Sequence, residues 1–250
     1  MNYHWNWRIF WEASPEGSGT YFATLFYGLG WTLATTLLAW TMALALGFVV
    51  GTLRTLPNRK ALLFGNAYVE LFRNIPLLVQ MFLWYFVVPE LLPAAIGDWL
   101  KSLPDASFVT AVLSLGFYTS SRVAVQVTSG IQTLPRGQRM AGLALGLTLP
   151  QTYRLVLLPM AFRIVIPPLT NEFINIVKNS AVALTIGLVE LTARTRSMQE
   201  FSFQVFEAFT MATLLYLAVN AAIAMLMRFI EQRLRVPGML GSSSTGGKQA

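Results

Sequence analysis

The sequence predicts an all-α integral membrane protein, built as one domain around about five transmembrane helices. Hydrophobic residues make up 55% of the 250-residue chain, charged residues make up only 12%, and the mean hydropathy is +0.55. A soluble core of this size cannot bury so much apolar surface, so the surplus has to face lipid. The apolar residues also gather into runs, and a helix needs a run of about 20 residues to cross a bilayer.

Five long apolar runs follow one another along the chain. The first and the fifth are free of charged residues, and the third contains only Arg122. The second is interrupted by Pro76, and the fourth contains Glu172 and Lys178. The five predicted spans cover residues of about 26–53, 61–88, 107–130, 162–189 and 208–227.

The distribution of charge between the spans predicts the orientation. Basic residues of three connections fall on one side of the membrane: Arg54, Arg59, Lys60, Arg136, Arg139, Arg154, Arg228, Arg233 and Arg235. The other side carries most of the acids: Glu12, Glu16, Glu90, Asp98 and Asp105. The positive-inside rule then places the N-terminus in the periplasm and the C-terminus in the cytoplasm, as an odd number of spans requires.

Both ends of the chain are predicted to lie outside the membrane domain. Residues 1–20 contain Trp5, Trp7 and Trp11 and are expected to rest in the outer interface, without a cleaved signal peptide. The transmembrane domain is expected over residues 21–235. Residues 236–250 are rich in glycine and serine and predict a flexible cytoplasmic tail.

Several classes of function are disfavoured by composition. The net charge of +7 is spread as single residues between apolar runs rather than as a stripe, which does not suit nucleic acid. The chain has no cysteine, which excludes disulfides and thiol chemistry, and no histidine pattern with metal-ligand spacing. It also lacks the glycine-rich loop G-x-x-x-x-G-K-[ST], so any ATP has to be hydrolysed by another polypeptide.

The connection between the third and fourth spans is unusual because it is basic and punctuated by glycine. It reads RGQRMAGLALGLTLPQTYRLVLLP, from Arg136 to Pro159. We expect two short cytoplasmic helices over about 137–158, with a bend at Gly146, a break at Pro150 and an end at Pro159. The residues alone leave two interpretations open: an amphipathic connector that holds anionic lipid, or a surface that binds a partner.

This connection resembles the cytoplasmic signature of bacterial ABC importer permeases, in which Glu-Ala-Ala is followed by a spaced glycine and a closing Ile-x-Leu-Pro. Met140 stands where the family has glutamate, and Gly142 where it has the second alanine. The signature falls on Met140, Ala141, Gly142, Gly146, Val156, Leu158 and Pro159. Three further blocks, at 68–93, 130–138 and 177–191, resemble polar amino acid permeases, in particular the glutamate/aspartate subgroup.

The resemblance implies a type I ABC importer permease of the bacterial inner membrane that imports acidic amino acids. Its implied partners are a dimeric ATP-binding cassette ATPase, a second permease chain that is a paralogue, and a periplasmic amino acid binding protein. ATP and Mg would be bound by the ATPase, and this chain would hold no cofactor. The implied coupling residues are Arg139, Met140, Ala141, Gly142, Gly146 and Pro159.

Arg122 is the first candidate for the substrate pathway. It lies well inside the third span and has no acid within four residues, and ionisable residues at that depth are costly. A lone guanidinium in a water-lined cavity can bind a carboxylate through two parallel hydrogen bonds. By the resemblance, Val125 stands where related permeases have glutamate, which would remove repulsion toward an anion. The alternative is an arginine that snorkels or pairs with another helix.

A second candidate is a polar stripe on the fourth span. Its residues follow steps of three and four, so they share one helix face, and they are Asn171, Asn175, Lys178 and Asn179. The stripe can line a pathway for a carboxylate, or its amides can join helices to one another. Arg73 of the second span is also a pathway candidate, although Glu70 lies three residues before it and can neutralise it.

Two other classes of function compete with the importer subunit. A stand-alone secondary transporter or channel would not explain the basic connection, and the five spans show no inverted repeat. A membrane enzyme would need a catalytic group of His, Asp or Glu residues, which the sequence does not offer.

Overall fold

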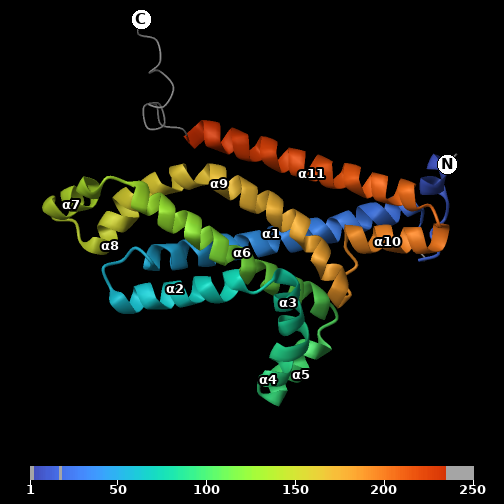
Figure 1. Cartoon of the computed structure of the whole chain (residues 1–250), viewed down its shortest axis with the longest axis horizontal. Helices are drawn as coiled ribbons and strands as arrows, with labels where there is room; N and C mark the ends of the chain where they lie inside the picture. The colour runs from blue at the N-terminus through green and yellow to red at the C-terminus, as the bar shows by residue number, and fades with distance from the viewer. Residues whose placement is uncertain (1–2, 17–18, 235–250) are drawn as a thin grey trace, which may run out of the picture.

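The computed structural model describes residues 3–16 and 19–234 and shows an elongated bundle of helices (Figure 1). The long helices are α1 (Tyr21–Leu53), α2 (Arg59–Asn74), α6 (Ala106–Thr133), α9 (Leu158–Asn179) and α11 (Val205–Leu234). The short α-helices are α3 (Leu77–Phe82), α4 (Val88–Leu91), α5 (Ala94–Ser102), α7 (Arg136–Ala144), α8 (Leu149–Thr152) and α10 (Leu191–Ser202). Short 3₁₀ and π segments complete the chain, at Trp7–Trp11, Leu83–Val87, Tyr153–Leu157 and Ser180–Ile186. The prediction of an all-α fold is confirmed.

Four stretches of helix are individually long and apolar enough to cross a membrane: Tyr21–Leu53, Ala106–Thr133, Leu149–Ile186 and Val205–Leu234. The remaining predicted span, 61–88, is broken. Its halves, α2 and the helix Leu77–Leu91, meet at an angle of 101°. Ile75 is extended because a following proline disfavours helical backbone, so the chain turns at Pro76. Residues 77–102 thus form an arm that leaves the bundle sideways (Figure 1).

The centre of the bundle is the contact between α1 and α6. Gly47 and Gly51 lie one turn apart on α1, and a Cβ at Gly51 would stand 2.7 Å from the carbonyl oxygen of Ala124. A Cβ at Gly47 would stand 2.5 Å from the Val123 side chain. The hydroxyl of Thr128 donates to the carbonyl oxygen of Gly51 at 3.1 Å. Small residues therefore bring the two backbones together, as is common between membrane helices.

The end of the bundle that holds the N-terminus is tied together by a buried carboxylate. Glu190 is fully buried and caps α10, accepting from the backbone N–H of Thr192 at 3.0 Å and of Ala193 at 2.9 Å. It also accepts from the hydroxyl of Tyr216 of α11 at 3.0 Å. Burial raises the pKa of the Glu190 carboxyl, and the hydrogen bonds from Thr192, Ala193 and Tyr216 oppose that shift. Glu190 thereby joins the start of α10 to α11.

The N-terminal segment packs on this same end. Glu16 accepts from Arg194 and from Ser197, each at 2.6 Å, and Tyr3 donates to the buried Glu207 of α11. Trp5 and Trp7 stack with ring centres 5.1 Å apart and stay about half exposed. The predicted tail, 236–250, lies outside the described residues.

Pro159 does not end a helix, and the expectation that it does was wrong. The chain is helical without a break from Leu149 to Ile186, so α8 continues directly into α9. A π turn over Tyr153–Leu157 comes just before the proline. A proline inside an α-helix lacks an N–H and crowds the preceding turn, and the wider π turn relieves both problems. The arm repeats this arrangement, with a π turn at Leu83–Val87 just before Pro89.

The close α1–α6 contact predicts that Gly51→Leu destabilises the protein. The new side chain would meet the backbone of Ala124, which cannot rotate away, and overpacking of this kind costs about 1–3 kcal/mol. The measurement is the thermal unfolding midpoint of the purified chain in detergent. Gly30→Leu is the matched control, because Gly30 lies on the same helix with nothing within 4 Å. Equal midpoints for the two variants would contradict the packing account.

Candidate functional site

The most polar contact inside the bundle joins α6 to α9. The Nε of Arg122 donates to the carboxylate of Glu172 at 2.9 Å. The side chain of Glu172 is only 9% exposed, whereas that of Arg122 is 38% exposed. One half of this ion pair therefore lies against the core and the other half is accessible.

Arg122 has a second neighbour, Tyr118, on its own helix. Its Nη1 donates to the hydroxyl of Tyr118 at 3.4 Å, and the guanidinium lies over the Tyr118 ring, 5.6 Å from the ring centre. These two hydrogen bonds use two of the five N–H groups that a guanidinium carries. The remaining N–H groups are free to bind a ligand oxygen.

The expectation of a lone guanidinium at Arg122 was wrong, and the alternative, an arginine that pairs with another helix, is confirmed. Glu172 comes from another helix, 50 residues further along the chain, and could not be found by searching the residues around Arg122. Tyr118 was missed altogether, although its spacing of four residues before Arg122 on one helix would have indicated the contact. At this site, Arg122 is paired with the carboxylate of Glu172 and lies over the ring of Tyr118.

The polar stripe on α9 faces away from the core of the chain. Asn171 and Lys178 are exposed, and Asn175 and Asn179 are half-buried. In the described chain, the side-chain hydrogen bonds of α9 are those of Thr170 and Glu172. The stripe thus makes no such bond within this chain and is available to a second chain or to a polar ligand. Glu172 follows Asn171 directly in the chain, but its side chain is buried and pairs with Arg122.

Arg73 lies apart from these residues. It is exposed in the last turn of α2, where a positive charge suits the helix C-terminus. Glu70 is not among its partners, because the ion pairs of the described residues join Lys101 to Glu90, Arg122 to Glu172, Arg194 to Glu16 and Arg196 to Glu200. The interpretation that Glu70 neutralises Arg73 was therefore wrong.

The predicted coupling segment forms a separate projection at the opposite end of the bundle from α10 (Figure 1). Arg139, Met140 and Ala141 of α7 are exposed, with Met140 at 67%. Leu145, just past the end of α7, is 83% exposed. A row of exposed apolar side chains beside an arginine is typical of a protein-binding surface.

Two glycines give this projection its shape. Gly142 is buried, and a Cβ there would stand 2.8 Å from the Thr152 side chain, so α7 packs directly on α8. Gly146 has a φ of +83°, the left-handed backbone that favours glycine, and it reverses the chain after α7. The predicted bend at Gly146 is thereby located. Pro159 lies exposed in the first turn of α9, at the base of the projection.

Comparisons with known proteins agree with this architecture. A family model described as "binding-protein-dependent transport system inner membrane component" matches residues 43–236. The glutamate/aspartate import permease protein GltJ of Escherichia coli is 48% identical over 244 residues, which cover 96% of this chain and 99% of that protein. The probable glutamine ABC transporter permease protein GlnM of Bacillus subtilis is 33% identical over 80% of this chain and 89% of its own length.

Solved structures also resemble the chain. A crystal structure of an amino acid ABC transporter with histidines superposes with a TM-score of 0.72 and 29% identity, covering 85% of this chain and 95% of that one. An inward-facing MetNI methionine ABC transporter superposes with a TM-score of 0.71 at 21% identity, covering 86% and 98% of the two chains. The second likeness is one of fold alone.

The packing of α7 on α8 predicts that Gly142→Val releases the projection. The added side chain has no room beside Thr152, so α7 should detach while the spans stay folded. Limited trypsin digestion should then cut after Arg139 several times faster than in the parent chain. Gly137→Val is the control, since Gly137 is on the same helix with nothing within 4 Å. Identical cleavage of both variants would rule out this packing.

Proposed function

Because this chain belongs to the family of binding-protein-dependent transport system inner membrane components, we propose that it is the permease subunit of an ATP-driven importer of acidic amino acids. The observation that carries the proposal is the 48% identity, over nearly the whole of both chains, with a permease named for glutamate and aspartate. The chain itself performs no chemistry. It is a multi-pass protein of the inner membrane.

The charges of the candidate site suit an acidic amino acid. Arg122 and Lys178 are cationic and Glu172 is anionic, so the site presents two positive charges and one negative charge. Glutamate and aspartate carry the reverse, with two carboxylates and one ammonium group. In the proposed complex, Arg122 binds one carboxylate, Glu172 receives the ammonium group, and the stripe Asn171, Asn175, Lys178 and Asn179 holds the second carboxylate.

Glu172 also stabilises Arg122 when the pathway holds no substrate. An unpaired arginine inside a bilayer is expensive, and its ion pair with Glu172 lowers that cost when no substrate is present. The accessible side of the guanidinium is then free to bind an incoming carboxylate without first leaving Glu172. Arg73, at the end of α2, lies apart from this site. It is proposed to contact the substrate at another point of the pathway.

The projection at α7 and α8 is proposed to bind the ATPase. A partner is needed because the sequence lacks an ATP-binding loop. Met140, Leu143 and Leu145 offer exposed apolar contacts, and Arg139 offers a charge for an acid on the partner. In the proposed assembly a dimeric ATPase binds ATP and Mg, a second permease chain completes the pathway, and a periplasmic binding protein delivers the amino acid.

The proposed orientation follows from this assembly and from the basic connections. The projection faces the cytoplasm, where ATP is available, and the end that holds Glu190 and the N-terminal segment faces the periplasm. Exposed Arg139 and Arg154 lie on the cytoplasmic side in this arrangement, as the positive-inside rule requires.

The substrate site predicts that Arg122→Ala strongly reduces uptake of glutamate and aspartate. Loss of charge-assisted hydrogen bonds should reduce uptake about 10- to 100-fold. Uptake is measured in proteoliposomes that contain the complete transporter, and co-purification of the ATPase reports assembly. Arg122→Lys, which keeps the charge but loses the planar donors, should be intermediate.

The control for this experiment is Arg163→Ala, which removes an exposed arginine of α9 away from the ion pair. It should leave uptake unchanged. Unaltered uptake kinetics in Arg122→Ala would refute the substrate contact, and loss of the co-purified ATPase in that variant would show a purely structural ion pair.

The role of the projection is tested by two substitutions at Gly146. Asparagine and aspartate both tolerate left-handed backbone, so each preserves the turn, and only aspartate adds a charge. Gly146→Asp should lower transport and the ATPase rate stimulated by the binding protein, whereas Gly146→Asn should retain most of both. Normal coupling in Gly146→Asp would favour the lipid-binding connector.

The class of transporter is tested by reconstitution. We expect no uptake by the purified chain alone, and ATP-dependent uptake once the second permease chain, the ATPase and the binding protein are present. Uptake driven by an ion gradient in the chain alone would instead establish the secondary transporter.

A further inference from the structure

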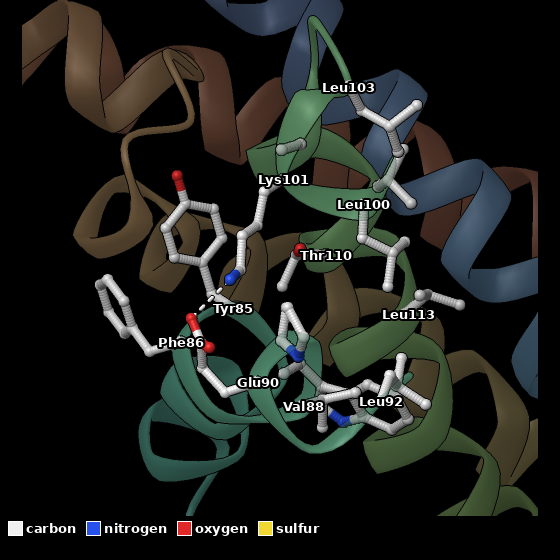
Figure 2. A pocket seen from close by; sticks show the side chains of 14 residues that line it. Tyr85, Phe86, Val88, Glu90, Leu92, Leu100, Lys101, Leu103, Thr110 and Leu113 are labelled. Carbon is white, nitrogen blue, oxygen red and sulfur yellow. Dashed lines mark ion pairs between the residues drawn. The ribbon is translucent and has the colours of Figure 1, made fainter. Parts of the chain in front are cut away.

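A cavity lies between the sideways arm and α6, and its lining does not include the candidate site residues. α4 and α5 form a tight hairpin, in which Gly97 packs directly against the backbone of Pro89. Between this hairpin and the first turns of α6 lies a cavity of about 450 Å³ (Figure 2). That volume lies within the range of about 300–1,000 Å³ that is usual for small-molecule sites.

The lining of the cavity is apolar with one charged pair. The charged side chains are Lys101 and Glu90, whose Nζ and carboxylate oxygen are 2.6 Å apart (Figure 2). Thr110 adds one hydroxyl. The other lining residues are Trp84, Tyr85, Phe86, Val88, Pro89, Leu92, Leu100, Leu103, Ala106, Val109 and Leu113. This composition fits a ligand with a long hydrocarbon part and a small charged part.

The surroundings of the arm are also apolar. Leu91 is 79% exposed and Trp99 is 59% exposed, on the hairpin that forms one wall of the cavity. The arm turns 101° away from α2 and lies across the bundle axis rather than along it. Exposed apolar side chains of this kind suit contact with lipid in an inner membrane protein, and tryptophan is enriched where lipid meets water. The cavity lies beside these side chains, and its ion pair offers charges to a head group.

We propose that the cavity binds a phospholipid of the phosphatidylethanolamine type, with one acyl chain between the hairpin and α6 and the head group on the Lys101–Glu90 pair. The head group carries an anionic phosphate and a cationic ammonium close together, and the pair presents the opposite charges in the same arrangement. The phosphate binds Lys101 and the ammonium donates to Glu90. An anionic head group would be repelled by Glu90, and a quaternary ammonium has no N–H to donate.

The charge state of the pair is favourable for this site. The hydrogen bond from Lys101 to Glu90 is the main cause that raises the pKa of Lys101, which favours the charged ammonium. Both side chains remain partly exposed, at 44% for Lys101 and 67% for Glu90, so a head group can reach them without displacing protein.

The test is the lipid retained by the full chain after reconstitution into nanodiscs of equal parts phosphatidylethanolamine, phosphatidylglycerol and phosphatidylcholine, followed by native mass spectrometry. We expect selective retention of one phosphatidylethanolamine. Lys101→Ala should lower this retention about tenfold, the factor that corresponds to one charge-assisted hydrogen bond. Leu100→Trp, which fills the cavity, should lower it to background.

Leu217→Trp is the matched control, because it enlarges a side chain of α11 that is 59% exposed and lies away from the cavity. It should not change retention. Equal retention of the three lipids, or full retention in Leu100→Trp, would overturn the proposal. In the complete transporter, a photoreactive residue at Leu103 should cross-link to lipid. A cross-link to the second permease chain or to the binding protein instead would identify a protein occupant and refute the lipid.

Discussion

The close approach of α1 and α6 is the constraint on which the rest of the structure depends. In lipid the hydrophobic effect does not draw helices together, so this contact relies on small residues and on the hydrogen bond from Thr128 to Gly51. It also fixes the rotation of α6. Because Val123 and Ala124 point at the glycines of α1, Arg122 is turned to the flank of α6 that meets α9. The ion pair with Glu172 is a consequence of how the two glycines pack.

The prolines show why local sequence rules predicted where a helix ends at one position and failed at another. Pro76 breaks its helix because Ile75 before it is extended and the chain leaves the bundle there. Pro159 was expected to do the same, yet its helix continues, with a π turn at Tyr153–Leu157 just before it. Tyr153 holds that turn against the segment that follows α1, by donating to the carbonyl oxygen of Thr55 at 2.8 Å. The break at Pro76 thus follows a local rule, whereas the turn before Pro159 has a tertiary contact that a sequence pattern does not contain.

The fold class and the spans could be predicted because a bilayer demands long apolar runs and leaves few alternatives. The two short helices between α6 and α9 could be predicted from their residues, including the bend at Gly146. The partner of Arg122 could not, since Glu172 lies on another helix. The burial of Gly142 could not be predicted either, because it depends on where Thr152 lies. The direction of the arm could not be predicted for the same kind of reason. What was missed in each case is the relative position of two elements.

The unbroken helix from Leu149 to Ile186 connects the two candidate sites mechanically. Its first turns belong to the projection, and Glu172 lies further along the same helix. Arg122, in contrast, is carried by α6, which is locked to α1. Under the proposed coupling, a pull on α8 is transmitted along α9 and displaces Glu172 relative to Arg122. Because Arg122 holds Glu172 through its Nε alone, a shift of α9 changes that one bond while the rest of the guanidinium stays in place. The ion pair is therefore where movement at the projection would first alter the site for a carboxylate.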